Sequence, residues 1–214
     1  MKSFIIAALG FTSAVFGHGF VRDICIDGHY YKMFDPNVMK SGEPNIAGWS
    51  IPNDSPVTDV LSKAIACNSG SVPGTAYAHA GAGNEITFLW NTWPESHLGP
   101  AITYLAPATS KDPTALNFFK IDQAGLLKDG TWITNSILKN NNSYTVKVPS
   151  DIKAGRYILR HELVALHDAK QANGAQVSEA PFPPRRVHQQ NPQLNSLVGN
   201  TNGLILVLPG LHKP

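Results

Sequence analysis

A histidine placed directly after a cleavable leader is the feature of this 214-residue sequence with the clearest chemical consequence. The first 17 residues have the layout of a secretory signal peptide: a basic start, an apolar run from Phe4 to Phe16, and Gly17 at the cut. Cleavage there begins the mature chain at His18, whose α-amine and imidazole together form a bidentate nitrogen chelate. One further imidazole completes a three-nitrogen site, and the affinity order of divalent metals favours copper(II) for such a set. The sequence therefore predicts a secreted protein, and it leaves two interpretations of His18 open: a copper ligand, or simply the residue that follows the cut.

Other histidines could supply the third nitrogen. His97 lies in a loop framed by proline and glycine, which leaves its ring able to face a surface site. In an extended strand, His161 and His167 would share one face because they are six residues apart. Gln176 follows in a turn-rich stretch. Each of these residues, taken alone, is also explained by a structural hydrogen bond. The remaining histidines are His29, His79, His188 and His212.

Several other catalytic chemistries find little support. The pair His161-Glu162 lacks the second histidine of a zinc-protease helix, because position 165 is alanine. The sequence has no Gly-x-Ser-x-Gly elbow and no phosphate-binding loop. Cys25 and Cys67 lack the local signature of a thiol nucleophile. A carboxylate pair for glycoside hydrolysis is not singled out by context and stays open as a third hypothesis.

The composition excludes several classes of protein. Charged residues make up 15% of the chain and hydrophobic residues 43%, which is typical of a folded globular domain rather than of a disordered tail or a coiled coil. The 17 basic and 15 acidic side chains leave a net charge of +2, so we expect no nucleic-acid partner. After the leader, no stretch approaches the roughly 20 apolar residues of a membrane span, so we expect no membrane partner.

Short apolar or alternating runs separated by glycine and proline predict strands rather than helices. A helical turn is expected only within 116–127, and a further apolar run at 203–209 is a candidate strand. We therefore predict an all-β fold: an immunoglobulin-like or fibronectin-like antiparallel β-sandwich with long loops. The expected strands lie at 21–26, 85–90, 101–105, 143–149 and 156–166.

Ten blocks of sequence, in order, resemble the fungal lytic polysaccharide monooxygenases of auxiliary activity family nine. The most specific are Trp-Asn-Thr-Trp-Pro-Glu-Ser-His-Leu-Gly-Pro at 90–100 and Gly-Arg-Tyr-Ile-Leu-Arg-His-Glu-Leu-Val-Ala-Leu-His at 155–167. Together the blocks span nearly all of residues 18–176. The other blocks are 18–21, 26–28, 46–50, 65–68, 118–121, 125–126, 140–143 and 173–176.

The resemblance implies a copper site and a substrate. His18, through its amine and ring, and His97 would hold one copper ion per chain, while His167 and Gln176 would act beside it as the catalytic pair. The implied co-substrates are O2 or H2O2 and an external electron donor, either a small reductant or a protein. The implied substrate is cellulose or a related β-1,4-glucan, oxidised at C1, C4 or both. A secreted, extracellular monomer is expected.

The resemblance ends abruptly after Gln176. Where the family carries an axial tyrosine and soon afterwards a cysteine, this chain has Ser178 and no cysteine. Cys67 would then lack its family partner, and whether it pairs with Cys25 stays open. We therefore divide the chain into a signal peptide at 1–17, a β-sandwich at 18–176 that lacks its C-terminal side, and an atypical tail at 177–214.

Two explanations for the tail are open. An in-frame splice donor after a glutamine codon encodes Gln-Val-Ser, as at 176–178, so the tail could be translated intron; the other explanation is divergence. The missing tyrosine also raises an alternative function: a catalytically impaired protein that binds copper or polysaccharide. Finally, Asn141 and Asn53 begin N-glycosylation sequons, which a secreted chain would expose.

Overall fold

The computed structural model describes residues 18–188 and the side chains of residues 18–180. The expected leader and the candidate strand at 203–209 lie outside the described residues. Among the residues that are described, no helix is long and apolar enough to cross a membrane.

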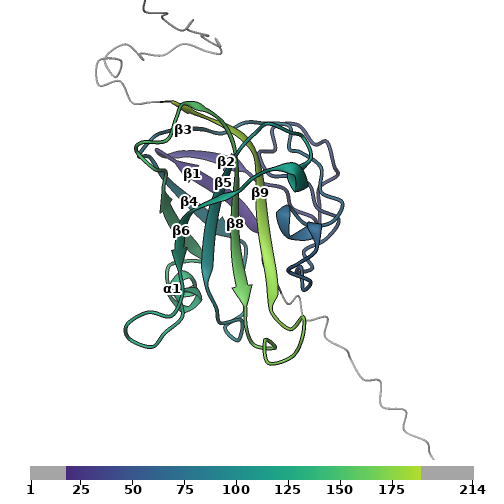
Figure 1. Ribbon diagram of the computed structural model, residues 1–214, viewed down its shortest axis with the longest axis vertical. Coiled ribbons are helices and arrows are strands. Elements are labelled where there is room, and N and C mark those ends of the chain that lie inside the picture. The colour runs from purple at the N-terminus through teal and green to yellow at the C-terminus, as the bar shows by residue number, and fades with distance from the viewer. Residues whose placement is uncertain (1–17, 189–214) are drawn as a thin grey trace, which may run out of the picture.

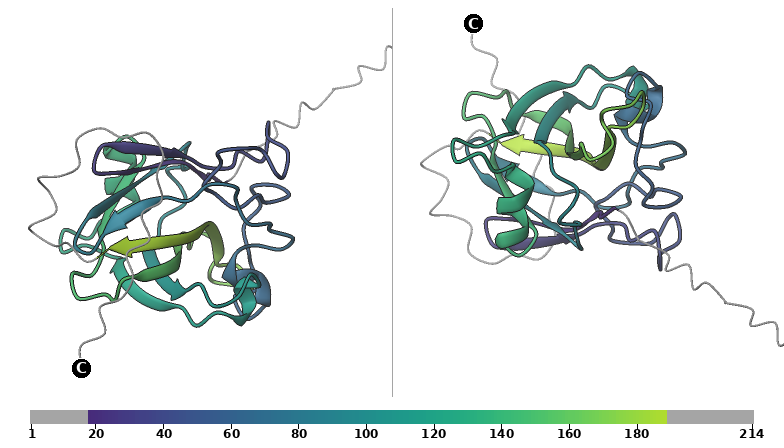
Figure 2. Two further views of the ribbon diagram at one scale, coloured as in Figure 1. Left: turned by 90° about the horizontal axis from the view of Figure 1, so that it is seen from above. Right: turned by 90° about the horizontal axis from the view of Figure 1, so that it is seen from below.

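Two β-sheets stack face to face, as the views from above and below show (Figure 2). All paired strands are antiparallel except β3 and β9, which run parallel. The predicted β-sandwich is therefore confirmed (Figure 1). One sheet has the order β2 (His29–Lys32), β1 (Val21–Ile26), β4 (Glu85–Trp90) and β7 (Ser143–Lys147). The other has the order β3 (His79–Gly81), β9 (Gln176–His188), β8 (Gly155–Ala165), β5 (Ala101–Pro107) and β6 (Phe119–Ala124).

The core lies between the sheets because alternate residues of each strand point inward. In β4, Ile86, Phe88 and Trp90 are buried while their neighbours are less so, and Ile24 of β1 packs with them. Burying each such side chain contributes roughly 1.5–3 kcal/mol. This packing fixes the frame whose strand ends carry the loops described below.

A third, irregular layer covers the outer face of the five-stranded sheet. It contains the short 3-10 helices η1 (Lys63–Ala66) and η2 (Pro113–Ala115). A second apolar cluster beneath it includes Trp49, Cys67 and Ile158. As a result β8 is buried on both faces over most of its length. Cys67 is a free thiol here, as is Cys25, so the structure does not pair them.

Two expected elements are corrected by the structure. Residues 116–127, expected to hold a helical turn, contain strand β6, which pairs with β5. The one α-helix of the described residues is α1 (Ile133–Lys139), which the sequence did not predict. At seven residues it is too short to show an apolar stripe, and only Thr134 and Ile137 are buried.

The sheet continues beyond Gln176, so the expectation of a missing last strand is wrong for residues 177–188. Strand β9 runs antiparallel to β8, from Gln176 opposite Ala165 to Val187 opposite Gly155. Pro183 and Pro184 do not end the strand, because they lie where its register against β8 shifts, and Pro181 lies in regular register opposite Arg160. Pairing with β8 and β3 supplies hydrogen-bond partners that the backbone of a buried strand requires.

Candidate functional site

The first residues of the described chain are hydrogen-bonded to the loop after β4. Phe20 donates its backbone N–H to Oδ1 of Asn91 (2.8 Å), and the Asn91 N–H donates to the Phe20 carbonyl (3.0 Å). A Cβ atom on Gly19 would lie 1.8 Å from the Thr92 carbonyl oxygen, so only glycine fits this close approach. This backbone pairing carries His18 to one end of the sandwich.

His97 is brought to the same end by a loop that is fixed at both sides. The Trp93 indole N–H donates to the His97 carbonyl oxygen at 2.7 Å. After the histidine, Leu166 donates its N–H to the Leu98 carbonyl (2.9 Å), and Gly99 packs too tightly against the end of β8 to carry a side chain. His97 is 8% exposed, so its ring is held in place rather than free in solvent.

Three of the predicted histidines meet at this end, where β8 finishes and β9 begins (Figure 1). The ring centroids of His18 and His97 are 4.8 Å apart, and His167 stacks on His97 at 4.1 Å with an interplanar angle of 29°. The Trp93 ring meets both His18 and His97 edge-on. The Gln176 side chain lies close enough to His18 to raise the pKa of its ring. The structure thus brings His18, His97, His167 and Gln176 together.

The surroundings keep the His18 ring neutral. Burial, followed by the nearby rings of His97 and His167, lowers the pKa of His18 from 6.5 to about 4, and the Gln176 side chain only partly opposes this. Between about pH 5 and 8 the imidazole therefore keeps a lone pair. A neutral imidazole is the form that binds a metal ion.

The histidine side chains at this site can hold a metal ion only together with a third nitrogen, the α-amine of His18. Within residues 18–180, no three side chains of His, Cys, Asp or Glu are grouped closely enough to hold a metal. A chelate with the α-amine closes through Nδ1 of His18, the ring nitrogen nearer the backbone, and the His18 and His97 rings lie close enough to share one ion, with centroids 4.8 Å apart. Two imidazoles and the α-amine that cleavage before His18 would release make the nitrogen set that suits copper(II).

Ser178 lies next to Gln176 on the same face of β9, two residues along the strand. It is 6% exposed, and its Oγ has no hydrogen-bond partner. Nε1 of Trp90 is also buried without a partner. The strand that supplies Gln176 therefore carries a small, unsatisfied hydroxyl where the resemblance predicted an aromatic phenol.

His161 does not belong to the cluster, which corrects the expectation that it shares a face with His167 in an extended strand. Strand β8 ends at Ala165, and His161 lies in the core, stacked on Phe88 at 4.0 Å. Its Nδ1 is 2.9 Å from Oγ1 of Thr103, and complete burial lowers its pKa to about 3. It is a structural histidine.

Both predicted glycosylation asparagines are exposed. Asn141 has φ of 51° in the turn between α1 and β7. Asn53 lies in the long loop between β2 and β3, where its Oδ1 accepts the Ser55 N–H at 2.9 Å. Neither is part of the histidine cluster, and their glycosylation stays a prediction.

Sequence analysis missed a second polar cluster, in the middle of the β8–β9 pair. Glu162 and Glu179 are directly opposite each other in the register, and each is 5% exposed. Arg160 is their counter-charge: its Nη2 is 3.3 Å from Glu162 Oε2, and its Nη1 donates to the Ile65 carbonyl at 3.0 Å. The Asn68 N–H donates to Glu179 Oε2 at 2.9 Å. The cluster ties η1 to the sheet.

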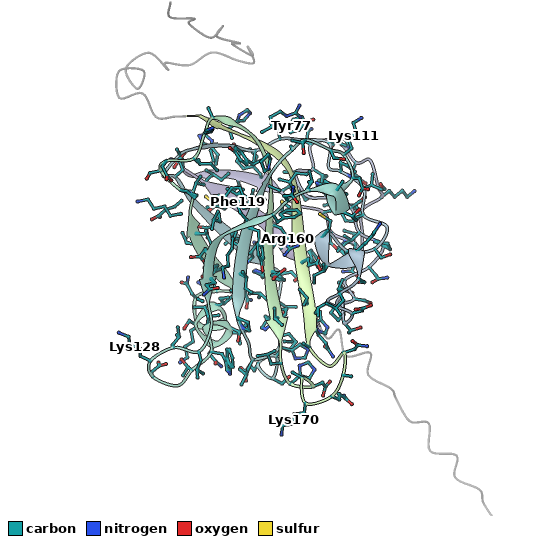
Figure 3. The ribbon with its side chains drawn as sticks, in the orientation of Figure 1. Tyr77, Lys111, Phe119, Lys128, Arg160 and Lys170 are labelled. Carbon is teal, nitrogen blue, oxygen red and sulfur yellow. The ribbon has the colours of Figure 1, made fainter. Side chains whose placement is uncertain are left out.

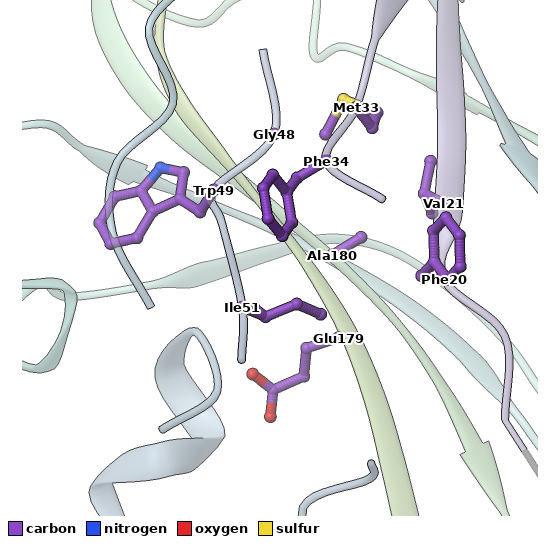
Figure 4. Close-up of a pocket in the computed structure, with 9 residues that line it drawn as sticks. All are labelled: Phe20, Val21, Met33, Phe34, Gly48, Trp49, Ile51, Glu179 and Ala180. Atoms are coloured by element: carbon purple, nitrogen blue, oxygen red, sulfur yellow. The ribbon is translucent and has the colours of Figure 1, made fainter. Parts of the chain in front are cut away.

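This carboxylate pair does not favour glycoside hydrolysis. Glu179 borders a cavity of about 20 Å³, lined mainly by apolar side chains such as Phe20, Phe34 and Trp49 (Figure 4). That volume has room for about one water molecule and none for a sugar. The described part of the chain therefore offers these two carboxylates no access to a polysaccharide.

Comparison with known proteins points to one family. The model of Auxiliary Activity family 9 (formerly GH61) matches residues 18–178. Lytic polysaccharide monooxygenase B of Geotrichum candidum is 44% identical over 181 residues, covering 80% of this chain and 49% of that protein. Monooxygenase I of Botryotinia fuckeliana is 43% identical, covering 80% and 69%. The chain spans about half the length of several curated relatives that it matches.

Solved structures agree with the family match. The extended catalytic domain of H. jecorina LPMO9A superposes with a TM-score of 0.74 at 36% identity, covering 81% of this chain and 75% of that one. A structure described as a cellulose-active polysaccharide monooxygenase from M. thermophila gives 0.67 at 28% identity, covering 80% and 78%. The family match begins at His18 and ends at Ser178, so it contains the whole histidine cluster.

Proposed function

This chain belongs to auxiliary activity family 9, and from that premise we propose that its processed form is a secreted copper-dependent monooxygenase. Its substrate would be cellulose or a related β-1,4-glucan, cleaved by oxidation at C1, C4 or both. The observation that carries the proposal is the convergence of His18, His97, His167 and Gln176 at one end of the sandwich.

His18 and His97 would hold the metal. The neutral ring of His18 and its freed α-amine supply two nitrogens, and His97 supplies the third. Trp93 limits the rotation of both rings by packing its edge against them. When bound, reduced copper supplies the activation of O2 or H2O2, with electrons from an external reductant or donor protein.

His167 and Gln176 would control protons and orientation beside the metal. The His167 side chain is 27% exposed, so it is accessible at the surface where a polymer would lie. Its imidazole can hold or release a proton there. The Gln176 side chain lies beside the His18 ring, where it can orient that ring and species bound next to the metal.

A glucan surface suits this end of the molecule. The family relative from M. thermophila is described as cellulose-active, and we extend that substrate to this chain. Cellulose is uncharged, and the near balance of acidic and basic residues here agrees with such a partner. We also propose that the protein acts outside the cell as a monomer.

Ser178 favours a second candidate function. A small hydroxyl in place of the family's tyrosine leaves the three nitrogens in place but changes the surroundings of the metal. Such a protein could bind copper and polysaccharide while oxidising its substrate poorly.

Product mass spectrometry on cellulose, with the chain beginning at His18, copper and a reductant, separates these functions. The first function predicts oxidised oligosaccharides that disappear when His97 is replaced by alanine or the reductant is omitted. Tight copper and cellulose binding without oxidised products would favour the second. Release of unoxidised sugars without reductant would contradict both and revive the hydrolase hypothesis.

A further inference from the structure

We propose that Asp168 is a positioning residue of the histidine cluster, which holds the His167 ring with its proton on Nε2 and its face against His97. The catalytic consequence rests on the proposed function. The arrangement itself belongs to the metal-free chain and can be tested there.

The contact that supports this role joins two neighbouring side chains at the surface, His167 being 27% exposed and Asp168 49%. Oδ2 of Asp168 lies 3.2 Å from Nε2 of His167. An ionised carboxylate can only accept, so a proton on Nε2 is attracted to it, whereas a lone pair on Nε2 would be repelled. Among the side chains of residues 18–180, Asp168 alone is seen to place a polar atom against a ring nitrogen of His167.

The backbone of Asp168 is itself fixed. Its carbonyl oxygen accepts the Gln171 N–H at 3.2 Å, and the Ala169 N–H donates to the Leu166 carbonyl at 3.1 Å. Gly174 closes the loop so tightly that a Cβ atom there would lie 1.8 Å from the Asp168 carbonyl oxygen. The carboxylate is therefore presented to His167 by a compact turn rather than by a loose loop.

The effect passes from His167 to the predicted metal ligand. The two rings stack at 4.1 Å, so the rotation of His167 limits that of His97. Both residues are anchored at the end of β8 through the bond from the Leu166 N–H to the Leu98 carbonyl. Removing the Asp168 carboxylate would leave the stacked partner of His97 free to rotate and to exchange its tautomer.

Nitrogen-15 NMR of the metal-free chain beginning at His18 tests the arrangement directly. Spectra are recorded at alkaline pH, where an ordinary imidazole is neutral. In the parent chain the His167 shifts should show the Nε2–H tautomer. In Asp168→Ala the ratio of the two tautomers should fall by about two- to fivefold, as expected for the loss of a charged contact between partly exposed side chains. The two averaged nitrogen shifts would then move toward each other.

Two further variants keep the test specific. Asp168→Asn retains an oxygen that can accept from Nε2–H and should restore much of the parent pattern. Lys170→Ala removes a charge from the same exposed loop and should leave the His167 shifts unchanged (Figure 3). A parent chain with the proton on Nδ1, or shifts unaffected by Asp168→Ala, would overturn the proposal.

The catalytic consequence has its own readout. With copper bound, Asp168→Ala should change the copper EPR spectrum and lower kcat several-fold while KM for the glucan stays the same. A change in KM alone would show that Asp168 contacts the substrate, and would overturn the positioning role. Failure of the NMR prediction refutes only this inference, whereas an NMR success without any oxidised product refutes only the proposed function.

Discussion

Two polar clusters with opposite surroundings lie along the β8–β9 pair, one beyond the end of the two strands and one in their middle. At their end lie the rings of His18, His97 and His167, some of them open to solvent. In their middle lie Arg160, Glu162 and Glu179, all enclosed beneath η1. Partial exposure at the first site leaves room for a ligand, whereas enclosure at the second leaves room only for the protein's own groups.

Burial acts on both clusters in the same direction, toward the neutral form of each group. At the open end it lowers the pKa of His18 to about 4, so a base loses its charge and gains a usable lone pair. In the middle it raises the pKa of Glu162 and raises that of Glu179 to about 8, so the Glu179 acid keeps its proton at neutral pH. The first effect prepares a ligand site, and the second links folding to pH.

Arg160→Ala should have the largest effect on stability. It removes the counter-charge that contacts Glu162 at 3.3 Å, and breaking a buried charge pair typically costs about 3–5 kcal/mol. Urea unfolding at pH 7 measures the loss. His167→Ala, at the open end, should cost about 0.5 kcal/mol or less by the same method. Equal losses from the two variants would show that the two regions do not differ as described.

Glu179→Gln should remove a pH dependence of stability. The pKa of Glu179 is about 8 in the folded chain and 4.5 ordinarily, so the folded state holds a proton that the unfolded state releases. This contribution is complete below about pH 4.5, declines as pH rises, and is lost above about pH 8. The slope is at most about 1.4 kcal/mol per pH unit.

Urea unfolding of both chains from pH 5 to 8 checks this expectation. Stability of the parent should fall with rising pH more steeply than that of Glu179→Gln, because glutamine imitates the protonated acid at every pH. Parallel curves would mean that another group holds the proton.

The contrast also explains what the sequence could and could not predict. Strands such as β1 and β4 were found at their observed bounds because their apolar residues alternate. Arg160 and Glu162 alternate in the same way, which normally marks a solvent face. They are buried because a third layer of loops covers the sheet, and no local sequence pattern indicates such a layer.

The chemistry of histidine and the family resemblance were enough to select the candidate histidines. They were not enough to predict which of these side chains touch. That His167 stacks on His97 depends on two loops meeting at the end of β8. Strand β9 was not predicted because its polar and proline residues break the alternation that indicates a strand. Its extended conformation depends on pairing with β8, which the local sequence pattern does not show. Whether residues 177–214 derive from an intron or from divergence stays a prediction, which the genomic sequence around codon 176 can decide.

Ser178→Ala should have a smaller effect of opposite sign. Because Oγ of Ser178 is buried without a partner, removing it should stabilise the fold by about 1 kcal/mol or leave it unchanged. Thermal unfolding of the two chains measures this difference. A loss above about 1 kcal/mol would show that the hydroxyl is bonded, for instance to a water molecule.

Glycosylation should have the smallest effect, because Asn141 and Asn53 lie apart from both clusters. Intact mass of the chain secreted by a fungal host should fall on glycosidase treatment, and Asn141→Gln or Asn53→Gln should each remove one glycan. Each substitution should change stability by about 0.5 kcal/mol or less. An unchanged mass after treatment would contradict both sites.

Pulsed EPR of the copper(II)-loaded chain beginning at His18 decides whether the histidine cluster is a copper site, because it counts the nitrogens that bind the metal. We expect two coordinated imidazoles and one amine nitrogen. In His97→Ala only one imidazole should remain, and the copper affinity should fall by about 100-fold or more, beyond the 10- to 100-fold typical when a residue that only contacts a ligand is changed. A spectrum and affinity that His97→Ala leaves unchanged would contradict this expectation.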